Sequence, residues 1–260
     1  IIAFNDQRVS SKRELVEDIT CCNGETAVLS VIRHGEEISL SLDPVLGEDG
    51  RYKLGIWVRD NTQGIGTLTY MREDGTFGAL GHGISDVDTG ELLHIQGGAL
   101  YQTEILGIQK GSKGSPGELS GIIRYSQSNC LGEITKNCSN GIYGKIGSEE
   151  RNRFTWTRMP VGYKQDMKVG KAQILFILDW QLDFYDVEIT KIDMDHEDTN
   201  KSFVIQVTDP RLLSATGGIV QGMSGSPVIQ EGKIVGAVTH VFVQDSASGY
   251  GIFIETMLEH

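Results

Sequence analysis

Glycine is the residue that most constrains the fold of this chain. It occupies 33 of the 260 positions, roughly twice the usual share of about 7%, and no Gly-X-Y period accompanies it. The chain has only 5 prolines, and the runs between the glycines are short and rich in β-branched residues. Because glycine permits the tight turns that join strands, this pattern predicts a mostly β chain.

Charge and hydropathy exclude several classes of protein. The chain carries 23 Lys and Arg against 35 Asp and Glu, a formal net charge of −12. An acidic balance argues against binding to nucleic acid or to anionic membranes, because both need a basic surface. Hydrophobic residues make up 39% and charged residues 22% of the chain, which is typical of a globular protein. No apolar run reaches the roughly 18 residues of a membrane-spanning helix.

The two ends of the sequence suggest a piece of a longer protein. Residues Ile1 to Phe4 are already an apolar strand, where a native chain rarely starts. Residues 258–260 read LEH, which resembles the start of a histidine tag, and we expect them to lie outside the fold. A native targeting segment or membrane anchor is therefore expected to be missing from this sequence.

The four cysteines exclude one metal site and leave one question open. No Cys-x-x-Cys pair is present, so a zinc ribbon is excluded. Cys130 and Cys138 either form a disulfide in an oxidising compartment or remain free thiols in a packed sheet. The adjacent Cys21 and Cys22 are expected to be structural. The acidic run at 193–198 lacks the glycine of an EF-hand loop, so we expect a solvated loop and no metal.

One helix is predicted near the N-terminus. Ser11 is expected to be its N-cap, and Glu14 to reach back to the Ser11 amide as in a capping box. Leu15 and Ile19, with Val16, supply the apolar stripe that would pack on a sheet.

Strands dominate the remainder of the predicted structure. We expect a first unit at residues 1–47, a linker at 48–60, and a second domain made almost only of strands at 61–257. Apolar and polar residues alternate at 64–70, 185–189 and 203–207, whereas 173–178 is a continuous apolar run. That run predicts a strand buried on both faces. Many strands with turns at this spacing indicate a sandwich or a barrel.

The strongest chemical signal is residues 222–227, which read GMSGSP. A serine between glycines on a turn exposes its hydroxyl, and the glycines let successive backbone N–H groups point to one place. By this spacing the N–H groups of Gly222 and Ser224 are the candidate oxyanion hole. Ser226 replaces the second glycine of the α/β-hydrolase elbow, so that fold is not indicated. The pattern instead resembles the nucleophile turn of chymotrypsin-like proteases. The alternative is a glycine-rich hairpin turn with a surface serine.

A serine nucleophile needs a base, and the chain offers six histidines. His82 lies between two glycines, which leave its imidazole uncrowded. His240 follows Thr239 on the strand after the serine turn, the strand that lines the S1 pocket in chymotrypsin-like folds. We therefore predict that His82 is the base and that Thr239 and His240 line the substrate pocket. The remaining histidines lie in a turn, a strand, the acidic run and the tag: His34, His94, His196 and His260.

The acid that would orient the base is not fixed by the sequence. Asp209 follows a predicted strand and precedes the serine turn, while Asp86 and Asp88 lie close to His82. Asp179, after the apolar run, is a further candidate. Such an acid fixes the imidazole tautomer and stabilises the imidazolium. Each of these residues is alternatively a turn cap, because Asp is a favoured turn residue.

Longer stretches of the sequence carry a family resemblance. Residues 9–15 (VSSKREL) and 31–37 (VIRHGEE) resemble the C-terminal part of a PDZ domain, with half of its peptide groove absent. FGALGHGISDVDTG (77–90), KGSKGSPGELSG (110–121), TDPRLLSATGGIVQGMSGSPVIQEGKIVGAVTHVF (208–242) and GYGIFIE (249–255) follow. Together they resemble the stage IV sporulation protein B family, PDZ-containing serine peptidases of endospore-forming bacteria. The likeness runs from residue 1 to about residue 257.

The resemblance implies a fold and a set of residues. The fold would be a chymotrypsin-like double β-barrel behind a PDZ domain, with no cofactor. The nucleophile would be Ser224, the base His82 and the acid Asp209, and Thr239 would also be functionally important. The order of the three residues matches chymotrypsin-like enzymes, but Asp209 lies closer to Ser224 in the sequence than the acid of that fold usually does.

The resemblance also implies a biological setting. Members of the family are made in the forespore and secreted into the space between the two membranes around it. There they cleave themselves and a regulatory subunit of a membrane-embedded metalloprotease complex, which activates the mother-cell sigma factor. Two other classes of function remain open for this chain: a PDZ-containing binding or signalling module with a degenerate protease fold, and a structural scaffold of the spore envelope.

Overall fold

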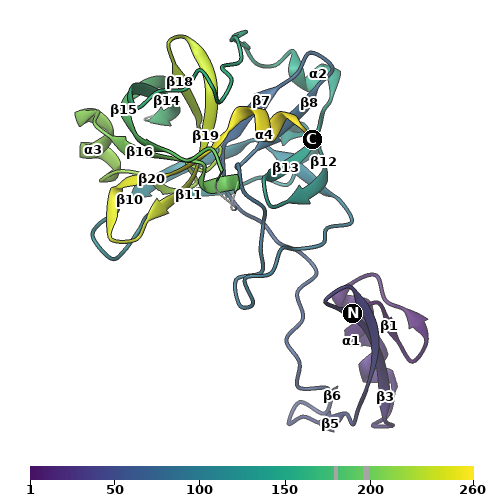
Figure 1. The fold of residues 1–260 in the computed structure, drawn as a ribbon. Helices are drawn as coiled ribbons and strands as arrows, with labels where there is room; N and C mark the ends of the chain where they lie inside the picture. Colours follow the sequence, from purple (N-terminus) through teal and green to yellow (C-terminus); the bar gives the residue numbers. More distant parts are fainter. Residues whose placement is uncertain (179–180, 196–198) are drawn as a thin grey trace. The chain divides into compact units, whose positions relative to one another are not determined.

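The structure is a computed structural model that describes residues 1–178, 181–195 and 199–260. The chain divides into two compact units, Ile1–Gln63 and Gly64–His260 (Figure 1). Over the described residues, no helix combines the length and the hydropathy needed to cross a membrane.

The first unit is a small sheet covered by one helix, α1 (Lys12–Cys21). The strand order is β2-β1-β3-β4, and a short hairpin of β5 and β6 follows. The strands are β1 (Ala3–Phe4), β2 (Gln7–Arg8), β3 (Ala27–Arg33), β4 (Glu36–Leu42), β5 (Val45–Leu46) and β6 (Tyr52–Lys53). Leu15 and Ile19 of α1 pack against Phe4, Ala27 and Leu29 of the sheet.

Helix α1 begins where the sequence predicts but is capped differently. The Ser11 side chain accepts a hydrogen bond from the Glu14 N–H at 3.2 Å, as expected of an N-cap. The Glu14 carboxylate does not return to the Ser11 amide. It accepts instead from the N–H of Ser10 at 2.8 Å and from its hydroxyl at 2.6 Å. Val16 is 49% exposed, so its expected place in the apolar stripe is wrong.

The stretch expected to be a linker, 48–60, is partly folded against the first unit. Tyr52, Leu54 and Val58 pack against its core, and the Lys12 N–H donates to the Asp60 carboxylate at 2.8 Å. The boundary between the compact units falls between Gln63 and Gly64.

The second unit contains a closed antiparallel barrel, with strand order β14-β15-β16-β20-β19-β18. Its strands are β14 (Gly170–Leu178), β15 (Gln181–Ile192), β16 (Phe203–Val207), β18 (Pro227–Gln230), β19 (Lys233–Phe242) and β20 (Asp245–Phe253). The inward-facing residues form a core that includes Ile174, Ile189 and Ile205, all fully buried. The mostly β fold with a barrel is therefore confirmed.

The other half of the second unit is an open five-stranded sheet. Its order is β7-β8-β13-β12-β9, formed by β7 (Leu68–Met71), β8 (Thr76–Ala79), β9 (Gly98–Tyr101), β12 (Cys130–Cys138) and β13 (Gly141–Ile146). A separate three-stranded sheet is formed by β10 (Thr103–Gln109), β11 (Gly117–Ile123) and β17 (Val220–Gln221). In the described residues only one barrel is closed, so the expected second barrel appears as an open sheet.

Short helices complete the second unit. They are η1 (Gln127–Asn129), α2 (Ser148–Arg151), η2 (Thr199–Lys201), α3 (Pro210–Thr216) and α4 (Ile254–Leu258). Because α4 ends at Leu258, the first of the three C-terminal residues expected outside the fold is helical.

Strand β14 corrects one prediction. The continuous apolar run at 173–178 suggested a strand buried on both faces. In the barrel, Ala172, Ile174 and Phe176 point inward and are buried, while Ile177 is 50% exposed. One face of the strand lines the barrel core and the other faces solvent, as in most antiparallel sheets.

The structure shows whether Cys130 and Cys138 form a disulfide. All four cysteines are free. Cys130 and Cys138 begin and end the same nine-residue strand, β12, which separates them by roughly 26 Å at about 3.3 Å per residue. A disulfide needs Cα atoms within about 7 Å, so this strand excludes the bond.

Candidate active site

The serine turn joins β17 to β18 and depends on two glycines. Gly222 has φ +102° and Gly225 has φ +93°, values that favour glycine. A Cβ on Gly225 would lie 2.1 Å from the carbonyl oxygen of Thr67. The turn is therefore pressed against the chain that leads into β7. Thr69 adds a further bond here, from its hydroxyl to the Gly225 carbonyl at 2.8 Å.

Ser224 is held from both sides. Its hydroxyl donates to the carbonyl oxygen of Thr239 on β19 at 2.8 Å. Its own carbonyl accepts from the Thr67 N–H at 2.9 Å. The neighbouring Met223 is fully buried in the barrel core, and its packing there holds the turn in place. Sequence reasoning missed both Thr67 and Met223; the methionine inside the glycine turn was the available signal.

Most backbone N–H groups of the turn already have a hydrogen-bond partner. Outside the strand ladders, the described hydrogen bonds use the N–H groups of Met223, Gly225 and Ser226, and not those of Gly222 and Ser224. The role of the Gly222 and Ser224 N–H groups as an oxyanion hole stays a prediction.

His82 follows a strained turn at the end of β8. Leu80 and Gly81 both have φ +70°, and the Gly81 N–H donates to the Ala79 carbonyl at 2.9 Å. A left-handed leucine costs free energy, and such strain clusters at functional sites. A Cβ on Gly81 would lie 2.9 Å from a methyl group of Thr239. The turn thus brings the His82 backbone against β19.

The His82 imidazole has two described contacts. Its Nδ1 lies 2.9 Å from the carbonyl oxygen of Gly83, and its ring centroid lies 4.8 Å from that of His240, with the planes tilted by 36°. A carbonyl accepts only from a protonated Nδ1, so the neutral tautomer leaves Nε2 as the basic nitrogen. Burial lowers the pKa of His82 below its ordinary 6.5, and the Gly83 carbonyl opposes that effect. The imidazole is therefore neutral near pH 7, as a base must be.

Ser224 and His82 contact adjacent residues of one strand, β19, rather than each other. No hydrogen bond joins them in the described residues. The Ser224 hydroxyl contacts the carbonyl of Thr239, and the His82 ring contacts the next residue, His240. In enzymes without substrate, catalytic hydrogen bonds are often long and tighten in the complex.

Asp209 does not lie beside His82. It caps α3, where its carboxylate accepts from the Arg211 N–H at 2.8 Å and from the Asp186 N–H at 3.3 Å. The Arg211 guanidinium donates to both of its oxygens, at 3.2 and 2.9 Å. This pairing lowers the pKa of Asp209 to about 2. Its role as the orienting acid stays a prediction that no contact in this structure supports.

The other candidate acids are not supported by a contact with His82 either. The Asp86 carboxylate caps the turn at 86–89, accepting from the N–H groups of Asp88 and Thr89 at 3.0 Å each. Asp86 therefore acts as a turn cap, which is the alternative role that the sequence allowed for it. Asp179, and His196 of the acidic run, lie outside the described residues. No carboxylate in the described part of the chain hydrogen-bonds to His82, and no cluster of His, Cys, Asp and Glu there suits a metal ion.

Thr239 does more than accept the serine hydroxyl. Its own hydroxyl donates to the Asn200 carbonyl in η2 at 2.6 Å, and the Asn200 side chain donates to the Ser139 carbonyl at 3.3 Å. Ser139 lies in the turn between β12 and β13, so this chain of bonds ties the barrel to the open sheet. The sequence indicated Thr239 but not Asn200, which follows the acidic run without a motif.

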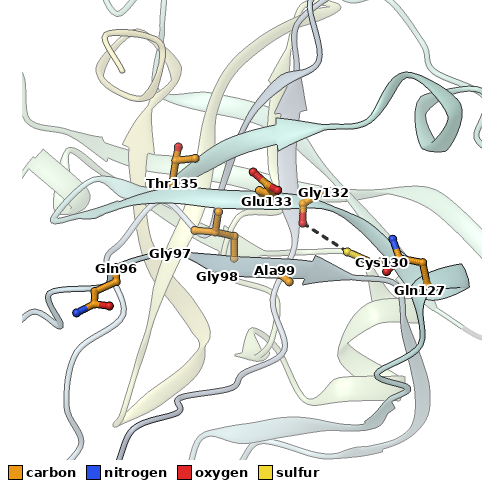
Figure 2. Close-up of a pocket in the computed structure, with 10 residues that line it drawn as sticks. Gln96, Gly97, Gly98, Ala99, Gln127, Cys130, Gly132, Glu133 and Thr135 are labelled. Atoms are coloured by element: carbon orange, nitrogen blue, oxygen red, sulfur yellow. Dashed lines mark hydrogen bonds between the residues drawn. The ribbon is translucent and has the colours of Figure 1, made fainter. Parts of the chain in front are cut away.

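A separate cavity of about 480 Å³ lies along strands β9 and β12. Figure 2 shows Gln96, Gly97 and Gly98 on one side of it and Glu133 and Thr135 on the other. None of its lining residues belongs to the predicted site, and β13 separates β12 from β8, which leads to His82.

A serine peptidase needs a hydroxyl, a neutral imidazole and backbone N–H donors in one place, and in this structure Ser224 and His82 contact adjacent residues of β19. Comparison of the sequence with known families agrees. Residues 50–258 match the model of the family described as SpoIVB peptidase S55, and the chain belongs to that family. The resemblance stated from its motifs, to a family of peptidases, is therefore confirmed over this range.

Solved structures give a more distant likeness. The chain resembles the HtrA-type protease AlgW, solved with a decapeptide, at 12% identity and a TM-score of 0.41, over 90% of this chain and 60% of that one. A variant of AlgW with the decapeptide matches at 13% identity and a TM-score of 0.36, over 63% of this chain and 61% of that one. The chain therefore spans less than two thirds of these proteins. None of the curated proteins matches it.

Proposed function

We propose that this chain is an endopeptidase that works by acyl-enzyme chemistry on a chymotrypsin-like fold. Nε2 of His82 takes the proton of the Ser224 hydroxyl as its oxygen attacks a peptide carbonyl. The N–H groups of Gly222 and Ser224 hold the resulting oxyanion. His82 then gives its proton to the leaving amine, and water attacks the acyl-serine by the same route, releasing the second product and restoring the hydroxyl.

One observation carries this proposal: adjacent residues of β19 hold the hydroxyl of Ser224 and the ring of His82. The Gly83 carbonyl fixes the tautomer that leaves Nε2 basic, a task that an aspartate performs in the usual triad. The resemblance alone supports Asp209 in that task.

The substrates and the setting follow from the family resemblance. We extend the proposal to cleavage of the chain itself and of a regulatory subunit of a membrane metalloprotease complex. The proposed location is the space between the forespore and mother-cell membranes, reached by secretion. Thr239 and His240 are proposed to lie beside the bound peptide, with no metal or cofactor involved.

Active-site labelling tests the proposal. A fluorophosphonate probe forms a covalent bond only with an activated serine, so the parent chain should be labelled, and Ser224→Ala and His82→Ala should not be. Ser214→Ala, a change in α3 rather than in the serine turn, is the matched control and should be labelled at the parental rate. Labelling that persists in Ser224→Ala would overturn the proposal.

The pH dependence of labelling provides a second test. Since burial places the pKa of His82 below 6.5, the base is lost only when the pH falls below that value. The rate should therefore rise through its acid midpoint below pH 6.5 and be level above it. A midpoint above 6.5 would show that a negative charge contacts the imidazole, and would favour an orienting carboxylate.

One observation favours a second function. The Ser224 hydroxyl donates to Thr239 and not to His82, an arrangement that also suits a binding module with a degenerate site. Such a module would bind peptide but would remain unlabelled at every pH. Peptide binding by a chain that never reacts with the probe would establish it.

A further inference from the structure

Strand β19 carries a bulge where it passes the serine turn. Its register with β20 pairs Val238 with Gly251 and Val241 with Gly249. Two residues, Thr239 and His240, therefore face a single residue of the partner strand. A bulge breaks the alternation of a strand and re-aims its side chains, and bulges are common beside active sites.

The bulge depends on a glycine in the facing strand. A Cβ on Gly249 would lie 2.5 Å from the carbonyl oxygen of His240. Any larger residue would push β20 away from the bulged segment. The close approach fixes the backbone of His240, and with it the direction of its side chain.

The side chain of His240 packs on the ring of His82. The centroid separation of 4.8 Å and the tilt of 36° lie in the range of favourable aromatic pairs. His82 is thus bounded on one edge by the Gly83 carbonyl and on one face by the His240 ring. In the described residues no carboxylate hydrogen-bonds to the His82 ring. Asp209, the acid that the family resemblance implies, is paired with Arg211 instead.

We propose that His240 is a positioning residue for the base, in addition to any contact with substrate. The proposal rests on the proposed function, in which His82 is that base. The His240 ring sets the plane of the imidazole, and this orientation keeps the Nδ1 proton on the Gly83 carbonyl, which fixes the tautomer. Because His240 directly follows the residue that holds the Ser224 hydroxyl, one bulged segment sets the distance between nucleophile and base.

The kinetic consequence separates this role from pocket lining. A displacement of about 1 Å at the reacting groups costs roughly 100-fold in rate. His240→Ala and His240→Leu, which remove the ring, should lower the maximal rate of fluorophosphonate labelling by roughly 10- to 100-fold. The probe concentration that gives half-maximal rate should not change. His240→Phe keeps a ring and should recover most of the rate, and Val243→Ala, an exposed change on the loop after β19, is the control.

A measurement on His82 itself decides the proposal without catalysis. The ¹⁵N chemical shifts of its ring report which nitrogen carries the proton. The parent and His240→Phe should show one neutral tautomer, protonated at Nδ1. His240→Ala and His240→Leu should show a mixture, while thermal unfolding confirms that each variant is folded.

Two results would overturn the role of His240. One is a change in the half-maximal probe concentration alone, which is the signature of a pocket residue. The other is an unchanged His82 tautomer in both ringless variants. A parent chain that is never labelled would instead refute the proposed function, while the tautomer measurement would still test whether His240 positions His82.

Discussion

The two halves of the peptidase unit contribute unequally to the site. In the described residues, the closed barrel has a core of 18 buried hydrophobic residues, whereas the open sheet has a core of 4. Ser224 belongs to the barrel half, and Met223 of its turn is part of the large core. His82 follows β8 of the open sheet and reaches the site through a strained turn.

This difference shows where the site is rigid and where it is adjustable. Ser224, the proposed nucleophile, is fixed by a closed barrel. His82, the proposed base, follows a strand of the open sheet, and its segment contacts the barrel through Gly81 at Thr239 and through its own ring at His240. A small seam core of Tyr143, Ala237, Ile252 and Met257 holds the halves together. Changes in the barrel should therefore act on stability, and changes in the sheet should act on the base first.

The largest effect is expected from a cavity in the barrel. Ile205→Ala removes a fully buried side chain and should lower the free energy of unfolding by about 2–5 kcal/mol. Chemical denaturation measures the loss, and labelling should fall together with the folded fraction. Ile177→Ala, on the outer face of the same barrel, should change stability by less than about 0.5 kcal/mol. Equal losses at the two sites would contradict the assigned core.

A cavity in the open sheet should separate activity from unfolding. Ile142 is buried and pairs in register with Ala79, three residues before His82. Ile142→Ala should cost about 2 kcal/mol, the low end for such a change. Labelling should fall at a lower denaturant concentration than the barrel unfolds, because the base is displaced first. Coincident curves would show that the two halves unfold as one.

Asp209→Asn tests a charge at the rim of the barrel. The folded state lowers the pKa of Asp209 from 3.8 to about 2, a difference worth roughly 2 kcal/mol of stability at neutral pH. Salt should reduce this contribution, since Arg211 is half exposed. The contribution is present above about pH 4 and disappears as the pH falls towards 2. Denaturation at pH 7 and pH 2 measures it.

The same variant distinguishes a structural aspartate from a catalytic one. Asp183→Asn, which removes a more exposed partner of Arg211, is the matched control and should cost less. Labelling by folded Asp209→Asn should stay close to that of the parent. A loss of roughly 10⁴-fold, as for the acid of a triad, would restore Asp209 as the orienting acid.

The smallest effect is expected at the bond between the halves. Thr239→Val keeps the shape of a buried residue but removes the hydroxyl that donates to the Asn200 carbonyl. The loss should be about 1 kcal/mol, with a several-fold slower labelling rate. Thr239→Ser keeps the donor and should label faster than Thr239→Val. The reverse order would show that the methyl group, which lies against Gly81, matters more.

Local chemistry made much of this fold predictable. The N-cap at Ser11, the alternation at 203–207 and the glycines of the serine turn each follow from a few neighbouring residues, and each is confirmed by the structure. The run at 173–178 was misread because periodicity does not show that the strand borders solvent on one face. The open half of the unit was missed for a similar reason, since closure depends on partners far apart in the sequence.

The site was predictable in its types of residue and less so in its connections. Glycines mark Ser224 and His82, and the N-cap role of Asp209 beside Arg211 is itself local, but it was not recognised from the sequence. The ring contact between His82 and His240 spans more than 150 residues, and the bulge that permits it exists only once β19 and β20 pair. Such contacts belong to the tertiary structure, and motifs do not encode them one residue at a time.

The bond between Thr67 and Ser224 has a mechanical consequence. Thr67 follows Gln63, the last residue of the first unit, by four positions, and its N–H holds the carbonyl of the nucleophile. The segment that opens the second unit is therefore hydrogen-bonded to the peptide group of Ser224. A displacement of the segment before β7 would therefore shift the serine turn, because the Thr67 N–H bonds the Ser224 carbonyl and the Thr67 carbonyl lies against Gly225.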